Sequence, residues 1–112
     1  MAKFERYLTG DFRGFLAYLD NAILGGSISA SLEDSSLVTL GDVQCAVRVY
    51  ERYSYLGQNR VSLNVTLLGQ GRDLYLSAIA SGGSQAVFFK INTFGESAFL
   101  DKLIDAVDRY RP

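Results

Sequence analysis

The spacing of apolar residues predicts two amphipathic helices, one near each end of the chain. Between residues 12 and 24 the apolar positions recur every three or four residues, and Asp11 precedes them as a helix N-cap. Gly25-Gly26 then supplies a stop that tolerates a left-handed backbone. A second stripe of the same kind predicts a helix over about 96–110.

Between the two helices, apolar and polar residues alternate, which is typical of half-buried strands. Strands are predicted over 27–32, 43–52, 61–68 and 74–81, with a weaker edge strand over 3–8. Residues 33–36 are predicted as a polar turn, and the loops at 57–59, 69–71 and 92–95 follow from their Gly and Asn residues. Residues 86–91 fit either a further strand or the entry to the last helix. Short polar loops favour antiparallel hairpins.

This order of elements predicts an α+β fold, β-α-β-β-β-(β)-α, in a single domain spanning residues 1–112. An antiparallel meander of four or five strands is expected to pack against an N-terminal and a C-terminal helix. In the strand over 43–52, the buried face is predicted to hold Val43, Cys45, Val47 and Val49. The order resembles the TATA-binding-protein-like and helix-grip folds.

Composition excludes several kinds of chemistry. The 112 residues contain no His and one Cys, so His-based nucleophilic dyads, His-ligated metals, thiolate zinc sites and intrachain disulfides are ruled out. Apolar residues make up 48% of the chain, which suits a globular protein. We expect no enzymatic activity, no cofactor and no metal.

Charge and hydropathy bear on partners and location. The formal net charge is −1, which gives no reason to expect general binding to nucleic acid or to anionic membranes. No apolar run approaches the length of a bilayer span, and the charged N-terminus does not fit a signal peptide. With its single Cys, the chain is expected to be a cytoplasmic protein.

Arginine and tyrosine alternate along one predicted strand. Residues 48–72 contain four Arg and one Glu, a local charge of +3. The strand period puts Arg48, Tyr50 and Arg52 on one face, with Tyr55 and Arg60 following. Such residues can stack on and fork-bind a phosphate, a carboxylate or a base. They also suit a solvated hairpin face on which Glu51 pairs across strands, or an oligomer interface.

A second candidate is the glycine-rich segment Ser81-Gly82-Gly83-Ser84-Gln85. Its backbone N–H groups could cradle an anion. It lacks the Lys-Ser/Thr of a phosphate loop, and an apolar run follows where that loop requires a helix. Ordinary turns or a bulge are the alternative interpretation.

Other chemical groups point to structural roles. Cys45 is expected to be a buried structural thiol, and Asp101, Asp105 and Asp108 to form a solvated helix face. Glu33-Asp34 lacks the spacing of a calcium loop. Phenylalanines from both ends of the chain could enclose a ligand cavity or fill a core; they are Phe12, Phe15, Phe88, Phe89, Phe94 and Phe99.

Three stretches carry a resemblance to a known family. The segments 45–55, 59–67 and 81–96 resemble a family of short bacterial proteins of unknown function, and the similarity covers nearly the full length. The resemblance implies a single-domain bacterial cytosolic protein and implies no activity or ligand.

Two function classes follow from these observations. The first is a small binding module that holds a small or anionic ligand between helices and sheet or at the Arg/Tyr face. The second is a structural or adaptor protein that self-associates through an exposed sheet face or edge strand. Nucleic-acid binding along residues 48–72 is a third hypothesis, which the net charge disfavours.

Overall fold

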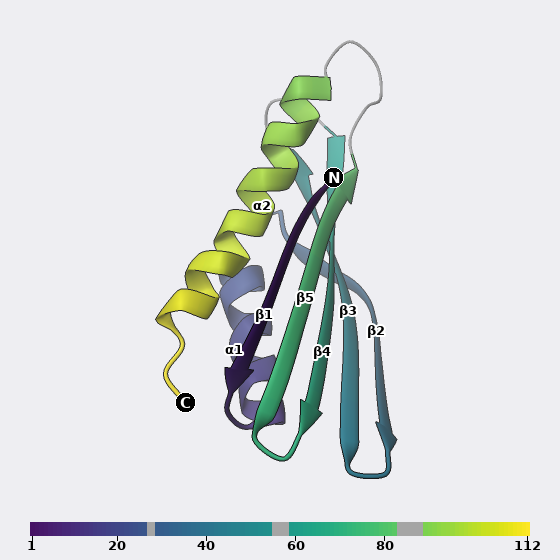
Figure 1. The fold of residues 1–112 in the computed structure, drawn as a ribbon. Helices are drawn as coiled ribbons and strands as arrows, with labels where there is room; N and C mark the ends of the chain where they lie inside the picture. The colour runs from purple at the N-terminus through teal and green to yellow at the C-terminus, as the bar shows by residue number, and fades with distance from the viewer. Residues whose placement is uncertain (27–28, 55–58, 83–88) are drawn as a thin grey trace.

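The protein folds into one antiparallel sheet with both helices on the same face (Figure 1). The computed structural model describes residues 1–26, 29–54, 59–82 and 89–112. The side chains of residues 54, 59 and 89–97 are not described. The elements are β1 (Ala2–Thr9), α1 (Phe12–Gly25), β2 (Ser31–Leu40), β3 (Val43–Ser54), β4 (Asn59–Gln70), β5 (Asp73–Gly82) and α2 (Phe89–Arg109). The predicted α+β class, with an antiparallel meander and two terminal helices, is confirmed.

The sheet has the strand order β1-β5-β4-β3-β2. Strands β2 to β5 form a meander, and β1 returns to pair with β5, from Ala2 opposite Ala80 to Thr9 opposite Asp73. Two tight turns close hairpins at Gly41 and Gly71, whose φ angles of 64° and 61° lie in the left-handed region that glycine adopts without strain. Because β1 lies at one end of the strand order and pairs only with β5, the edge strand predicted near the N-terminus is confirmed.

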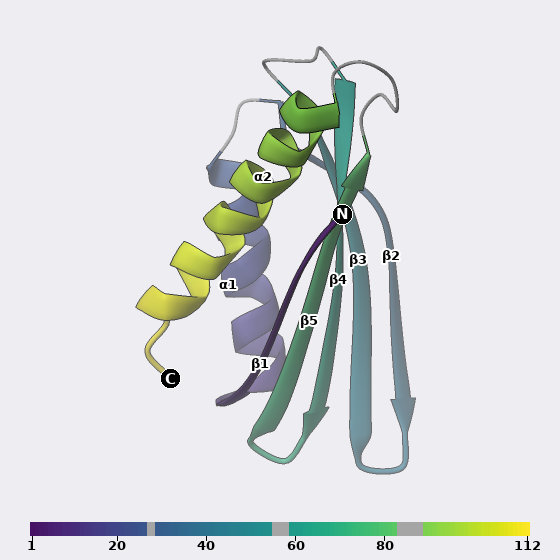
Figure 2. The same ribbon diagram turned by 45° about the horizontal axis from the view of Figure 1, so that its top comes forward.

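Helices α1 and α2 cover only one side of the sheet, which we call the inner face (Figure 2). Helix α2 packs along β1, β4 and β5, and α1 packs against β4 and α2. The core lies between these layers and contains Phe15, Leu19 and Leu103, all fully buried. Gly69 leaves room for this packing, because a Cβ there would come within 2.6 Å of the Phe12 ring.

The two faces of β3 are opposite to the prediction. Ala46 and Tyr50 are the buried residues of this strand, while Val43, Cys45, Val47 and Val49 point to the outer face and are half-buried. Sequence alternation identifies which residues share a face, but it does not say which face the helices cover. In β3, the apolar face is the one that the helices leave open.

Two segment boundaries also differ from prediction. The strand predicted over 27–32 is wrong: β2 begins at Ser31, and the supposed turn at 33–36 lies inside it. A register shift between Leu32 and Asp34 accommodates Glu33 as a β-bulge, and the residues from Asp34 onward pair regularly with β3. Residues 27–28 lie outside the described part of the chain.

Helix α2 begins earlier than predicted. Residues 89–95 are helical, so the predicted loop at 92–95 is wrong, and residues 89–91 are part of a helix and not of a strand. Residues 86–88 are not among those described. For residues 89–91, the alternative of an entry to the last helix is confirmed. The Asn and Gly residues of 92–95 favour a loop, but this segment continues the helix.

Helix α1 follows its prediction closely. It spans Phe12–Gly25, and Asp11 caps it by accepting a hydrogen bond of 2.8 Å from the Gly14 amide. The helix ends at the predicted Gly25-Gly26 stop, but Gly26 has φ −87° and a right-handed conformation instead of a left-handed one.

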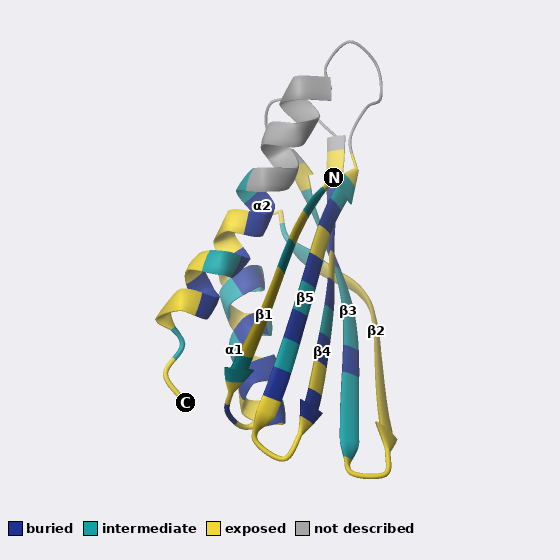
Figure 3. Cartoon of the chain, in the orientation of Figure 1, coloured by how far each residue is buried: buried dark blue, intermediate teal, exposed yellow. Residues whose placement is uncertain are grey.

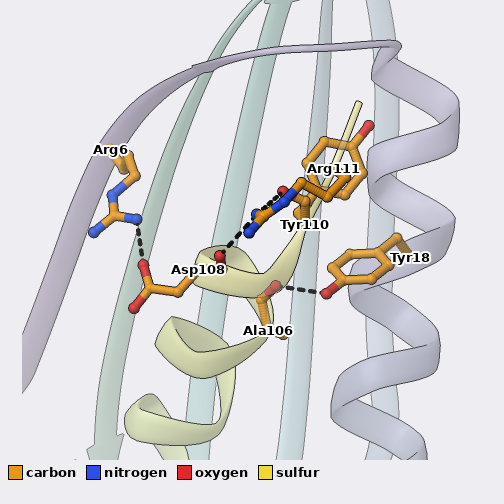
Figure 4. A network of polar contacts seen from close by, with 6 residues as sticks. All are labelled: Arg6, Tyr18, Ala106, Asp108, Tyr110 and Arg111. Carbon is orange, nitrogen blue, oxygen red and sulfur yellow. Dashed lines mark hydrogen bonds and ion pairs between the residues drawn. The ribbon is translucent and has the colours of Figure 1, made fainter.

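The end of α2 is attached to both β1 and α1 (Figure 4). Arg6 of β1 pairs with Asp108 at 2.6 Å, and the Tyr18 hydroxyl of α1 donates to the Ala106 carbonyl at 2.6 Å. Tyr110 packs edge-on against Phe15, with ring centroids 4.7 Å apart. These contacts orient α2 across the sheet.

Candidate functional site: the inner-face arginines

The structure divides the predicted site residues between two faces. Arg48, Tyr50 and Arg52 share the inner face, beneath the helices, whereas Arg60 and Ser81 lie on the outer face. Tyr55, Gly83 and Ser84 lie outside the described residues. The Arg/Tyr alternation therefore brings three of the predicted residues together, and Arg60 does not belong with them.

Tyr50 sits in the core and is held there by a carboxylate from α1. Its side chain is 0% exposed, and its hydroxyl donates a hydrogen bond to Asp20 Oδ1. Burial, and next this hydrogen bond, raises the pKa of Tyr50 above its ordinary value. The phenol is therefore a neutral hydrogen-bond donor at physiological pH.

Arg48 approaches the same carboxylate. Its Nε lies 3.4 Å from Asp20 Oδ1, and both side chains are largely covered, with 16% and 24% of their surface exposed. This distance is at the long end for a hydrogen bond. The Arg48 guanidinium keeps donor capacity beyond this contact.

Arg52 lies two residues further along the same face, without a carboxylate partner among the described residues. Its guanidinium carbon sits 4.7 Å from the centroid of the buried Phe99 ring of α2. This stacking is a cation–π contact. Burial lowers the pKa of Arg52, as expected of a cation that loses water without gaining an anion.

On the outer face, Arg60 is part of a surface ion-pair group. It pairs with Glu51 at 2.7 Å and with Glu33 at 3.3 Å, and its guanidinium lies over the Tyr53 ring. This is the cross-strand pairing of Glu51 that the sequence left open as an alternative. Exposed pairs of this kind contribute little stability. The two carboxylates nevertheless neutralise the charge of Arg60.

The glycine-rich segment has a backbone role at its described end. Gly82 has φ 122°, and a Cβ there would lie 2.6 Å from the Arg60 carbonyl oxygen. Ser81 pairs with Ser62 in the sheet. Both residues therefore have a structural role at the end of β5, where the backbone passes close to β4.

The remaining candidates occupy structural positions. Cys45 is a free, half-buried thiol on the outer face and not a core residue. Asp101, Asp105 and Asp108 form an exposed helix face as predicted. Within the described part of the chain, no three His, Cys, Asp or Glu side chains gather as metal ligands would, and no helix there is long and apolar enough to cross a bilayer.

Phenylalanines fill the described interior. Phe12, Phe15 and Phe99 are all buried in the core cluster, whereas the side chains of Phe88, Phe89 and Phe94 are not described. Hollows lined by described residues lie between α1 and α2, around Asn21 and Lys102, and on the outer face, around Tyr7 and Leu68.

Sequence reasoning missed Asp20. The residue follows Leu16 by four positions and precedes Ile23 by three, so helical periodicity places it at the border of the buried stripe. A carboxylate there indicates a polar partner inside the fold. The identity of that partner depends on how α1 lies on the sheet.

These features define an α+β protein with two helices on one face of an open antiparallel sheet and an arginine–tyrosine strand beneath them. The chain belongs to the family of unknown function DUF6054, whose model matches residues 1–111. No curated protein matches it. Among solved structures, the chain is similar to TTHA0849 from Thermus thermophilus, with 12% identity, a TM-score of 0.29 and 95% of each chain covered.

Proposed function

We propose that the protein is a binding module that holds the anionic group of a small ligand at Arg52, on the inner face of the sheet. The observation that carries this proposal is the half-buried Arg52 guanidinium, which has no carboxylate partner among the described residues. A cation removed from water without a counter-ion is costly. A bound carboxylate, phosphate or sulfonate would offset this cost with charge-assisted hydrogen bonds.

The neighbouring residues support a ligand with an apolar or aromatic body. Arg52 stacks on Phe99 and lies directly opposite Val61 in the sheet, and both of these residues are buried. Tyr50 separates Arg52 from Arg48 on the same face. An anionic head at the Arg52 guanidinium would leave the rest of the ligand next to Phe99 and Val61.

The role is binding without turnover, and we place it in the cytoplasm. A free thiol at Cys45 suits a reducing compartment. On the inner face of β3, the arginine side chains supply the donors that can recognise an anion, whereas the Tyr50 hydroxyl already donates to Asp20.

Titration with 8-anilinonaphthalene-1-sulfonate, an aromatic anion, tests the proposal by fluorescence. We expect saturable binding to the wild type and a loss of about tenfold or more in affinity for Arg52→Gln, the size expected when a charge-assisted hydrogen bond is removed. Inorganic phosphate should compete with the dye, because both ligands use the same guanidinium.

Arg60→Gln is the matched control, since it removes one arginine from the opposite face. The affinity of Arg60→Gln for the dye should stay within about twofold of the wild-type affinity. Equal dye affinity in the wild type and Arg52→Gln would exclude the site, as would an effect of the same size in Arg60→Gln.

A further inference from the structure

Strand β2 is an exposed edge of the sheet. It pairs with β3 on one side only, and in the described part of the chain no strand lies on its other side. Residues 32–40 are all exposed, and Figure 3 shows the strand in the exposed colour along nearly its whole length. An edge of this kind presents a row of backbone N–H and C=O groups that can pair with another strand.

The second half of β2 lacks the usual protection of an edge strand. Residues 35–40 contain no charge, no proline and no glycine, and Leu37, Val38 and Leu40 are 47%, 56% and 81% exposed. Natural edges are commonly blunted by charges, proline or bulges. Here the bulge and the acidic residues Glu33 and Asp34 lie only at the other end of the strand.

We propose that this edge pairs antiparallel with the β2 strand of a second copy of the chain. The two five-stranded sheets then join into one continuous sheet, with the helices of both copies on the same face. A second copy fits because two equal strands related by a two-fold axis satisfy each other's backbone groups. The charges select the antiparallel direction, since a parallel pair would place Glu33 and Asp34 next to their own copies.

The geometry of the strand also selects a register. Residues opposite each other in an antiparallel pair lie on the same face of the sheet. The two-fold axis must therefore pass between one residue and the same residue of the second copy. The regular stretch after the bulge is 34–40, and its midpoint is Leu37. In this register Asp34 lies opposite Leu40, whereas a shift of the axis to Val38 would place Asp34 opposite Asp42.

The outer face offers a different contact that the experiment must separate from this one. The strand pairings place Val38, Cys45, Leu68, Tyr75 and Tyr7 in one row across that face. Stacking of two outer faces would bury Leu68, which is 41% exposed on the central strand β4. Pairing through the β2 edge leaves Leu68 in solvent.

Sedimentation equilibrium in the micromolar range, on the full chain, tests the edge pairing. We expect a wild-type dimer, a dimer at least about tenfold weaker in Leu37→Lys, where two ammonium groups would meet on the axis, and an unchanged dimer in Leu68→Lys. Circular dichroism checks that each variant is folded. If Leu37→Lys does not fold, Leu37→Glu repeats the test with two carboxylate groups on the axis.

Two results would overturn the proposal. A wild-type monomer throughout the concentration range would show that the edge does not pair. Dissociation of the dimer by Leu68→Lys would place the contact on the outer face. Neither result bears on dye binding at Arg52, because that site lies on the inner face at the opposite end of β3.

Discussion

At the scale of single residues, Tyr50 shows how a polar group is kept inside an apolar layer. The side chain is fully buried, and its hydroxyl has the Asp20 carboxylate as acceptor. A buried hydroxyl without a partner would cost about 1–3 kcal/mol. The contact therefore ties α1 to β3 beside Arg48, which approaches the same carboxylate.

The raised pKa of Tyr50 predicts a loss of stability in alkali. Above pH about 10 the unfolded chain gives up the phenolic proton that the folded protein still holds, so the stability present at neutral pH falls as pH rises. For one tyrosine the slope approaches about 1.4 kcal/mol per pH unit. Urea unfolding between neutral pH and pH about 11 measures it.

Tyr50→Phe should remove this contribution and cost about 1 kcal/mol at neutral pH, because the hydrogen bond to Asp20 is lost. Tyr53→Phe, at a position 59% exposed, is the control and should keep the alkaline slope of the wild type. The same slope in Tyr50→Phe as in the wild type would show that the buried phenol is not its source.

At the scale of elements, the positions where strands end depend on backbone conformation as much as on side chains. Gly71 and Gly82 both have positive φ angles, 61° and 122°. Nothing lies within 4 Å of a Cβ placed on Gly71, whereas a Cβ on Gly82 would meet the Arg60 carbonyl. Alanine substitutions at Gly71 and Gly82 can therefore distinguish two costs. At Gly71 the cost is backbone strain alone, and at Gly82 a close backbone contact adds to it.

Gly71→Ala is expected to lower the free energy of unfolding by about 1–2 kcal/mol, the cost of a left-handed alanine. Gly82→Ala should lose at least about 1 kcal/mol more, because β4 and β5 must also move apart. Chemical denaturation of the two variants gives the comparison. Equal losses would mean that the approach of Gly82 to Arg60 is not a constraint.

At the scale of the whole molecule, the sheet divides the protein into a covered and an open side. Leu67 and Leu68 are neighbours in β4, yet Leu67 is 0% exposed on the inner face and Leu68 is 41% exposed on the outer face. Among the described residues, the core packing lies on the inner face, and the outer face is the side that both helices leave uncovered.

This one-sided arrangement predicts different costs for adjacent substitutions. Leu67→Ala should lower the unfolding free energy by about 3–5 kcal/mol through lost burial and a cavity. Leu68→Ala should cost less than about 1 kcal/mol, as for an exposed position. Thermal or urea unfolding distinguishes the two, and similar losses would indicate that the outer face is covered in solution.

The sequence by itself determined the element types, the antiparallel pairing through short turns and the shared face of Arg48, Tyr50 and Arg52. These properties follow from local periodicity and turn chemistry, which act over a few residues. It also indicated Asp11 as the cap of α1.

Only the tertiary structure decided which face of β3 is buried, that Asp20 is the partner of Tyr50, and that Arg60 lies apart from Arg52. These facts depend on where α1 and α2 lie on the sheet. Alternation is symmetric between the two faces of a strand, and in β3 the face with the valines is the open one. The choice was made by helices far away in the sequence, because they bury the inner residues of β4 and β5 and cover the same side of β3.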